Sequence, residues 1–171
     1  PRPGGHPLDP QEWARLEALT EGELLQALER LLVDGGFEPF SRGVDRTGLP
    51  LVEPPDGPGP VWAASAEQHV EALLHQWDPA LSDGRVAACA VAYDALLHDP
   101  GSHDATDAIA VLFAFDSGRV ARVMQRYRRS GRTVTLLERS SDAARGRLRL
   151  RPGRLGGRPP DADRRAGPRT P

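Results

Sequence analysis

The most apolar part of the chain, between Thr106 and Arg129, has the pattern of two antiparallel strands joined by a tight turn. Ala108 to Phe115 is a run of eight apolar residues rich in Ile, Val and Phe, which is typical of a buried strand. Asp116-Ser117-Gly118 follows, and its glycine suits the left-handed position of a three-residue hairpin loop. We therefore expect the core to be built on this hairpin.

Helical spacing dominates the N-terminal part of the chain. Asp9-Pro10 is a typical helix start, and Thr20 with Glu23 has the spacing of a capping box, so two helices are predicted before Gly35-Gly36. The second of these helices carries an apolar stripe at helical spacing. Its members are Leu24, Leu25, Leu28, Leu31 and Leu32.

A third helix is predicted behind Ser65, where Gln68 completes another capping-box spacing and Asp78-Pro79 ends the pattern. Its predicted apolar face consists of Val70, Leu73, Leu74 and Trp77. Apolar alternation predicts further strands at residues 85–97 and 132–138, and a short strand at 37–40.

These elements predict an α+β fold, in which N-terminal helices precede a three- to four-stranded antiparallel meander and pack on one face of it. We expect a single domain over residues 9–139, containing a Pro/Gly-rich surface loop at 41–60. Residues 1–8 and 140–171 are rich in Pro, Gly and Arg and poor in large apolar side chains. Both ends are therefore predicted to be disordered.

Charge divides the chain into two unlike parts. Residues 1–118 contain 20 acidic residues and 6 Arg, whereas residues 119–171 contain 16 Arg and 4 acidic residues, which gives balances of −14 and +12. Either the two parts neutralise each other, within one molecule or between two, or the basic part binds an acidic protein partner. Arg122, Arg126 and Arg128 share one face of the second hairpin strand and are the candidate binding residues. Nucleic acid is not expected as a partner, because aromatic residues are not interleaved with these arginines.

Cellular location is predicted from cysteine usage and hydropathy. Cys89 is the only cysteine, so no internal disulfide can form and a reducing compartment is the default. No apolar run approaches the length of a membrane span, and the N-terminal residues do not have the pattern of a signal peptide. The sequence therefore predicts a cytoplasmic protein without a membrane segment.

Candidate chemistry gathers around the loop between the strands at 85–97 and 106–115. The residues are Tyr93, Asp94, His98, His103 and Asp107. Carboxylates and imidazoles could bind a divalent metal or form an acid–base pair. The same residue types are common in exposed loops, however, and their spacing fits no metal-ligand pattern. We therefore expect neither a metal nor a cofactor, and keep the acid–base group as the alternative.

Two resemblances rest on the sequence of this region. The strand ending in VAYDALL, followed by TDAIAVLF and QRYRR, resembles a pattern in small uncharacterised bacterial proteins and implies no activity. The succession from Val61 to Tyr127, with FAFDSGRVARV at the hairpin, is similar at the level of fold to NTF2-like (SnoaL-like) domains. That resemblance implies a cone-shaped sheet around a small-molecule pocket. The N-terminal leucine-rich helices and the Pro/Gly-rich segment before Val61 depart from it.

Two functions follow from these observations. The first is a small non-catalytic binding or protein-interaction domain, and the second is an NTF2-like pocket protein, an enzyme in which the Asp/His/Tyr group supplies acid–base chemistry. A sheet curled around an apolar pocket favours the second, whereas a sheet covered by the helix that follows Ser65 favours the first.

Overall fold

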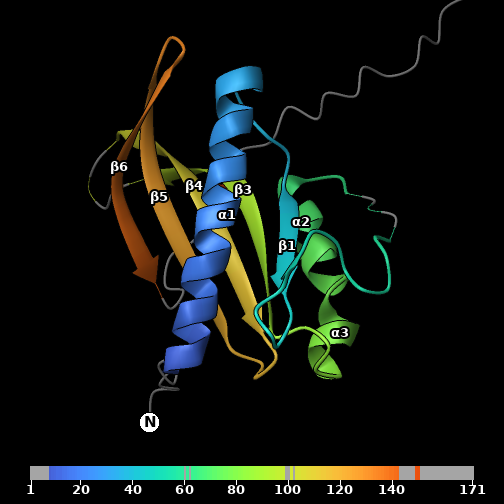
Figure 1. Cartoon of the computed structure of the whole chain (residues 1–171). Coiled ribbons are helices and arrows are strands. Elements are labelled where there is room, and N and C mark those ends of the chain that lie inside the picture. The colour runs from blue at the N-terminus through green and yellow to red at the C-terminus, as the bar shows by residue number, and fades with distance from the viewer. Residues whose placement is uncertain are drawn as a thin grey trace, which may run out of the picture.

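A long N-terminal helix lies across one face of an antiparallel sheet in the computed structural model of the chain (Figure 1). The structure describes residues 8–59, 61, 63–98, 101, 103–142 and 149–150. The elements are α1 (Pro10–Asp34), β1 (Phe40–Val44), β2 (Pro50–Leu51), α2 (Ala66–His75), α3 (Asp78–Ser82), β3 (Ala88–His98), β4 (Ala105–Phe115), β5 (Val120–Ser130), β6 (Thr133–Asp142) and β7 (Arg149–Leu150). The predicted α+β class is confirmed, with more strands than predicted. No helix among these residues is both long and apolar enough to cross a bilayer.

The predicted hairpin, β4 with β5, lies inside the sheet between β3 and β6. The strand order is β2-β1-β3-β4-β5-β6, all neighbours are antiparallel, and β7 pairs with β3. β4 and β5 pair in register from Ala114 opposite Val120 to Ala108 opposite Arg126. Gly118 adopts the left-handed conformation that the turn requires, with φ of 80°.

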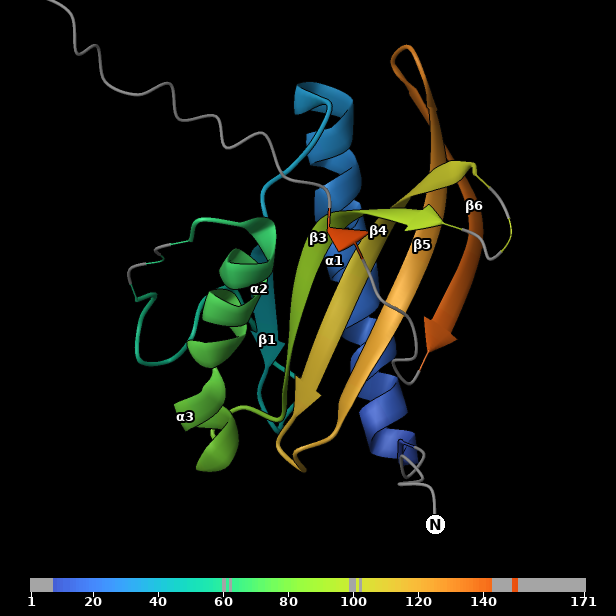
Figure 2. The same cartoon turned by 180° about the vertical axis from the view of Figure 1, so that it is seen from behind.

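Helices cover both faces of the sheet, which corrects the expectation that they would share one face. Ala88, Ala90 and Ala92 of β3 belong to the core under α1, whereas Cys89 and Val91 face the opposite way. α2 and α3 lie on that second face (Figure 2). Because β3 is apolar at nearly every position, both of its faces can be buried, as in a central strand between two layers.

α1 is one continuous helix, so the prediction of two helices in this region is wrong. The hydroxyl of Thr20 donates to the carbonyl of Leu16 at 2.7 Å, inside the helix, instead of capping a new one. The true capping box lies at the start, where Asp9 and Glu12 each accept a hydrogen bond from the other's backbone N–H. Gly35 ends the helix with φ of 77°, as predicted.

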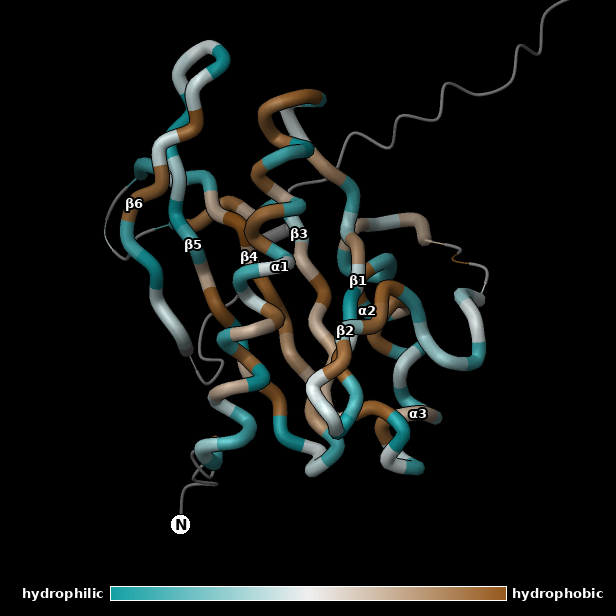
Figure 3. The backbone as a smooth tube through the Cα atoms, in the orientation of Figure 1, coloured by the Kyte–Doolittle hydropathy of each residue, from teal (hydrophilic) through white to brown (hydrophobic). Residues whose placement is uncertain are grey.

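The predicted leucine stripe is wider than the face that α1 buries. Leu24 and Leu31 are in the core, whereas Leu25 and Leu32 are 62% and 51% exposed. Figure 3 shows the apolar C-terminal end of α1 in brown, where exposed Leu32 and Val33 follow the buried Leu31.

The segment predicted as a surface loop, 41–60, contains most of β1 and all of β2, and the predicted strand at 37–40 overlaps β1 only at Phe40. α2 begins as predicted, since the Ser65 side chain accepts from the backbone N–H of Gln68. α2 ends at His75, before Asp78-Pro79, which begins α3.

Much of the predicted terminal disorder falls outside the described residues. This applies to residues 1–7 and to most of 140–171. Within the predicted C-terminal tail, residues 140–142 continue β6 and residues 149–150 form β7.

Candidate functional site

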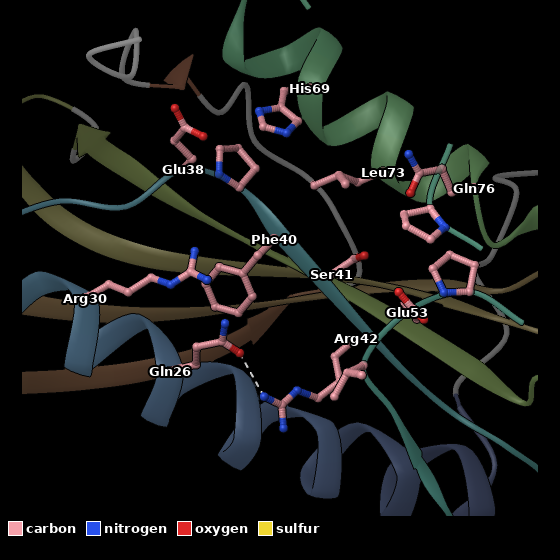
Figure 4. Close-up of a pocket in the computed structure, with 14 residues that line it drawn as sticks. Gln26, Arg30, Glu38, Phe40, Ser41, Arg42, Glu53, His69, Leu73 and Gln76 are labelled. Atoms are coloured by element: carbon pink, nitrogen blue, oxygen red, sulfur yellow. Dashed lines mark hydrogen bonds between the residues drawn. The ribbon is translucent and has the colours of Figure 1, made fainter. Parts of the chain in front are cut away.

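A groove of about 440 Å³ lies along the outer edge of β1, between α1 and α2 (Figure 4). Phe40, Ser41 and Arg42 of β1 line it centrally. One wall belongs to α1 and the opposite wall to α2. The wall residues are Gln26 and Arg30 from α1, His69 and Leu73 from α2, and Gln76 at the C-cap of α2.

The edge of β1 is only partly paired. β1 pairs with β3 over its full length, but β2 covers it only at Gly43 and Val44. The Val44 carbonyl accepts from the Ala87 N–H at 2.9 Å, so it points toward β3. Backbone groups alternate in direction along a strand, which turns those of Gly43 and Ser41 to the opposite side. Ser41 therefore presents its N–H and C=O in the groove, where no other described strand pairs with it.

Trp77 holds this part of β1 in place from the α2 side. Its indole Nε1–H donates to the Ser41 hydroxyl at 3.0 Å, and the Trp77 side chain is fully buried. The ring lies so close to Gly43 that an added Cβ would stand 2.3 Å from Cζ3 of Trp77. Only glycine fits at this position, so Gly43 and Trp77 together fix β1 against α2 and α3.

Two arginines stand on the α1 side of the groove. Arg42 donates from Nη2 to the Gln26 side-chain oxygen at 2.8 Å, and the Arg30 guanidinium lies 4.6 Å above the Phe40 ring. Within the described part of the chain, neither forms an ion pair. The groove therefore contains two cationic groups that are held in place and available to an anion.

Glu23 is buried on α1, one turn before Gln26. Its side chain has no exposed surface, and neither carboxylate oxygen has a hydrogen-bond partner in the described structure. Burial raises the pKa of Glu23 to about 8, against the opposing effects of Arg42 and Arg30. Glu23 is therefore mostly protonated at neutral pH.

No protein-family model matches the chain, and searches of curated proteins and of solved structures found no significant match.

The predicted acid–base residues do not meet in one place. Tyr93 and Asp94 are neighbours in β3 and so lie on opposite faces of the sheet. Tyr93 packs in the core under α2, where burial raises the pKa of its hydroxyl and nearby Arg122 opposes that shift. Asp94 accepts a hydrogen bond from the Tyr127 hydroxyl at 3.1 Å on the α1 side.

The other loop candidates lie near the far end of the β3–β4 pair. His98 pairs with Ala105 at the end of that ladder, His103 lies in the loop, and Asp107 stands opposite Leu96. In the residues the structure describes, no three His, Cys, Asp or Glu side chains are grouped so that they could hold a metal ion.

The three candidate binding arginines differ in environment. Arg122 is half-buried beside Tyr93, and its buried Nε has no hydrogen-bond partner among the described residues. Arg126 forms an ion pair with Glu138 at 3.3 Å, and Arg128 is exposed. They do not make one open basic surface, and their role in binding stays a prediction.

The sequence does not predict the groove, because it predicts a loop over most of β1. The signal in FSRGV is weak, since a strand of five residues with Ser, Arg and Gly has low intrinsic strand preference. Gly43 inside that stretch was the usable sign, because an interior glycine often marks the close approach of another group.

Proposed function

We propose that the chain is a non-catalytic binding domain that accepts an extended peptide segment of a partner protein at the free edge of β1. The single observation that carries this proposal is the position of the Ser41 backbone N–H and C=O, which lie in the groove on a side of β1 where no other described strand pairs with them. An added strand would continue in the place where β2 leaves β1 after Leu51. Strand addition of this kind supplies backbone hydrogen bonds for affinity and alternating side chains for specificity.

The surroundings of the edge support this function. A neighbouring strand runs about 4.8 Å away, so a peptide paired with Ser41 would lie between the α1 and α2 walls. Exposed strand edges promote indiscriminate pairing unless they are short or covered. Among the described strands, none pairs with the outer edge of β1 at residues 40–42. That length is flanked by the two helices and by the segment that follows β2, which limits access to a slender extended segment.

The cytoplasm is the proposed location. The reason is the absence of any cysteine pair, since Cys89 stands alone and buried in β3.

A linear heptapeptide library displayed on phage and selected against the full chain tests the proposed function. Enriched peptides are then synthesised and titrated into ¹⁵N-labelled protein. We expect the Ser41 amide resonance to shift most, since its N–H lies in the groove. Copies of the peptides methylated on alternate backbone nitrogens should lose binding in one of the two methylation patterns, because half of a strand's N–H groups face its neighbour.

Two matched variants locate the binding. His69→Trp fills the groove from the α2 wall, whereas His75→Trp places the same ring on the same helix at an exposed position outside it. We expect the first to abolish binding and the second to preserve it. A library without enriched sequences, or peptides that bind both variants equally, refutes the proposal.

The alternative, an NTF2-like pocket enzyme, ranks second. It needs an acid–base group facing one cavity, and the opposite orientations of Tyr93 and Asp94 weigh against that pair. Turnover of a small molecule that Tyr93→Phe abolishes would reverse the ranking.

A further inference from the structure

We infer that the peptide bound at the β1 edge carries an acidic residue directed at Arg42 and Arg30, between apolar residues directed at Leu73 of α2. This inference rests on the proposed function and specifies its ligand. It follows from the directions in which side chains leave β1 and from the charges on the two walls of the groove.

Strand geometry determines which wall each residue of the peptide meets. The Ser41 side chain points toward the α2 side, where it accepts from Trp77, and Phe40 belongs to the core under α1. Residues directly opposite each other in a sheet point to the same face. The peptide residue opposite Ser41 therefore points toward α2, and the residues on either side of it point toward α1. Specificity has a period of two along the peptide.

The α1 wall favours a carboxylate. Arg42 and Arg30 leave unused donors and have no ion-pair partner among the described residues. Arg42 is already oriented by its hydrogen bond to Gln26, and Arg30 by its contact with the Phe40 ring. A guanidinium that is held in place loses little freedom when it binds a carboxylate, and the resulting hydrogen bonds are charge-assisted. An acidic residue is thus the side chain that this wall binds best.

The α2 wall favours an apolar side chain. Leu73 lines the groove midway between His69 and Gln76 and is partly buried against the core under α2 (Figure 4). An apolar side chain on the peptide would extend that packing.

A basic peptide residue is the competing choice, because Glu38 and Glu53 also line the groove. An experiment must therefore distinguish an acidic from a basic residue.

Three capped pentapeptides distinguish an acidic from a basic preference. They are Ac-Thr-Val-Glu-Val-Thr-NH2 and its counterparts with Gln or Lys in the central position, each titrated into the full ¹⁵N-labelled chain at low and physiological salt. We expect the Glu peptide to bind at least fivefold more tightly than the Gln peptide, with the difference shrinking as salt rises. The Lys peptide should bind most weakly.

Arginine variants test the pairing. Arg42→Gln should reduce the preference for Glu over Gln to less than twofold, and Arg30→Gln should reduce it in part. Arg46→Gln is the matched control, because Arg46 pairs with Asp116 outside the groove and its loss should leave the preference intact. Thermal unfolding of each variant identifies any that fail to fold, and Arg30→Gln then serves in place of Arg42→Gln.

The outcomes separate this inference from the proposed function. Equal binding of the Glu and Gln peptides, or tighter binding of the Lys peptide, overturns the inference while leaving strand addition intact. If none of the three peptides shifts the Ser41 amide while a library peptide does, the acidic pattern is likewise wrong. If neither pentapeptides nor library peptides bind, the proposed function itself fails.

Discussion

Glu12 and Arg119 join the first turn of α1 to the turn between β4 and β5. The Arg119 Nη1 donates to Oε2 of Glu12 at 2.8 Å across 107 positions of sequence, and the Ser117 hydroxyl donates to Oε1 at 2.5 Å. Glu12 also closes the capping box with Asp9 and is only 2% exposed. Burial works against its ionisation, but the bonds from Ser117, the Asp9 backbone and Arg119 together lower the pKa of Glu12.

Glu12→Gln should therefore destabilise the fold. A hydrogen bond to a charged group contributes about 1.5–3 kcal/mol, so we expect a loss of about 2 kcal/mol in the free energy of unfolding at pH 7. Urea denaturation followed by circular dichroism measures it. Glu17→Gln is the control, because Glu17 is exposed on the same helix. Because the folded-state pKa of Glu12 is lowered, its contribution is present above the unfolded pKa and falls away as pH drops through the folded pKa. If Glu12→Gln lowers the free energy of unfolding equally in strongly acidic buffer and at pH 7, this explanation is wrong.

Gly43→Ala should destabilise the chain through overpacking. The new methyl group would lie 2.3 Å from Cζ3 of Trp77, so either the ring or β1 must move. Overpacking of a core typically costs about 1–3 kcal/mol. Gly36→Ala is the matched control, since no atom of the described residues lies within 4 Å of a Cβ added there. Equal unfolding midpoints for the two variants would show that Trp77 does not constrain Gly43.

The hairpin, the α+β class and the start of α2 followed from local patterns, because eight consecutive apolar residues and a turn glycine specify a strand pair without outside help. The Thr20–Glu23 spacing wrongly predicts the start of a second helix. A threonine inside a helix can donate a hydrogen bond to the carbonyl four residues earlier, as Thr20 does to Leu16. β1 depends on pairing with β3 rather than on its own residues. The groove could not be predicted at all, because Arg42 meets Gln26 only after α1 docks on the sheet.

Charge neutralisation within one molecule predicts weak binding of nucleic acid. Among the described residues, two ion pairs join α1 to the basic part of the chain: Glu12 with Arg119 in the β4–β5 turn, and Glu21 with Arg139 in β6. Titration of the full chain with a fluorescent duplex and a single strand should give dissociation constants no tighter than about 10⁻⁴–10⁻⁶ M at physiological salt. Tight, salt-resistant binding that is lost when Arg122, Arg126 and Arg128 are changed together to Ser would overturn this prediction.

Glu23 should make stability fall with rising pH. Its folded-state pKa of about 8 lies above the ordinary value of 4.5, so the folded chain retains a proton that the unfolded chain releases. The stabilisation is complete below the unfolded pKa and is lost as pH rises, at about 1.4 kcal/mol per pH unit, until pH passes about 8. The difference in unfolding free energy between Glu23→Gln and wild type should therefore increase from pH 5 to pH 8. If the free energy of unfolding depends on pH in the same way for Glu23→Gln and wild type, Glu23 gains a partner in solution.

Peptide binding should be linked to the same proton. Arg42 from β1 and Arg30 from α1 are the charged groups that favour ionised Glu23. The core residues that β3 and β4 pack against α1 are apolar, and β6 contributes Val134 there together with Arg139, which pairs with Glu21. Cys89 lies on the other face of β3 and stays neutral, because burial raises its pKa to about 12. A peptide carboxylate at the two arginines would offset their effect and raise the pKa of Glu23 further. The protonated form would then bind the peptide more tightly.

The acidic pentapeptide should consequently bind several-fold more weakly at pH 9 than at pH 7. Glu23→Gln, which stays neutral, should remove that dependence while preserving affinity at pH 7. The Gln pentapeptide is the second control, because a neutral side chain does not offset the arginines and its affinity should change little with pH. Calorimetry in two buffers of different ionisation enthalpy measures the number of protons taken up or released on binding. Proton uptake near pH 8 should accompany binding of the acidic peptide to wild type only. Proton release, or equal pH dependence in the Glu23→Gln variant, would place the coupling elsewhere.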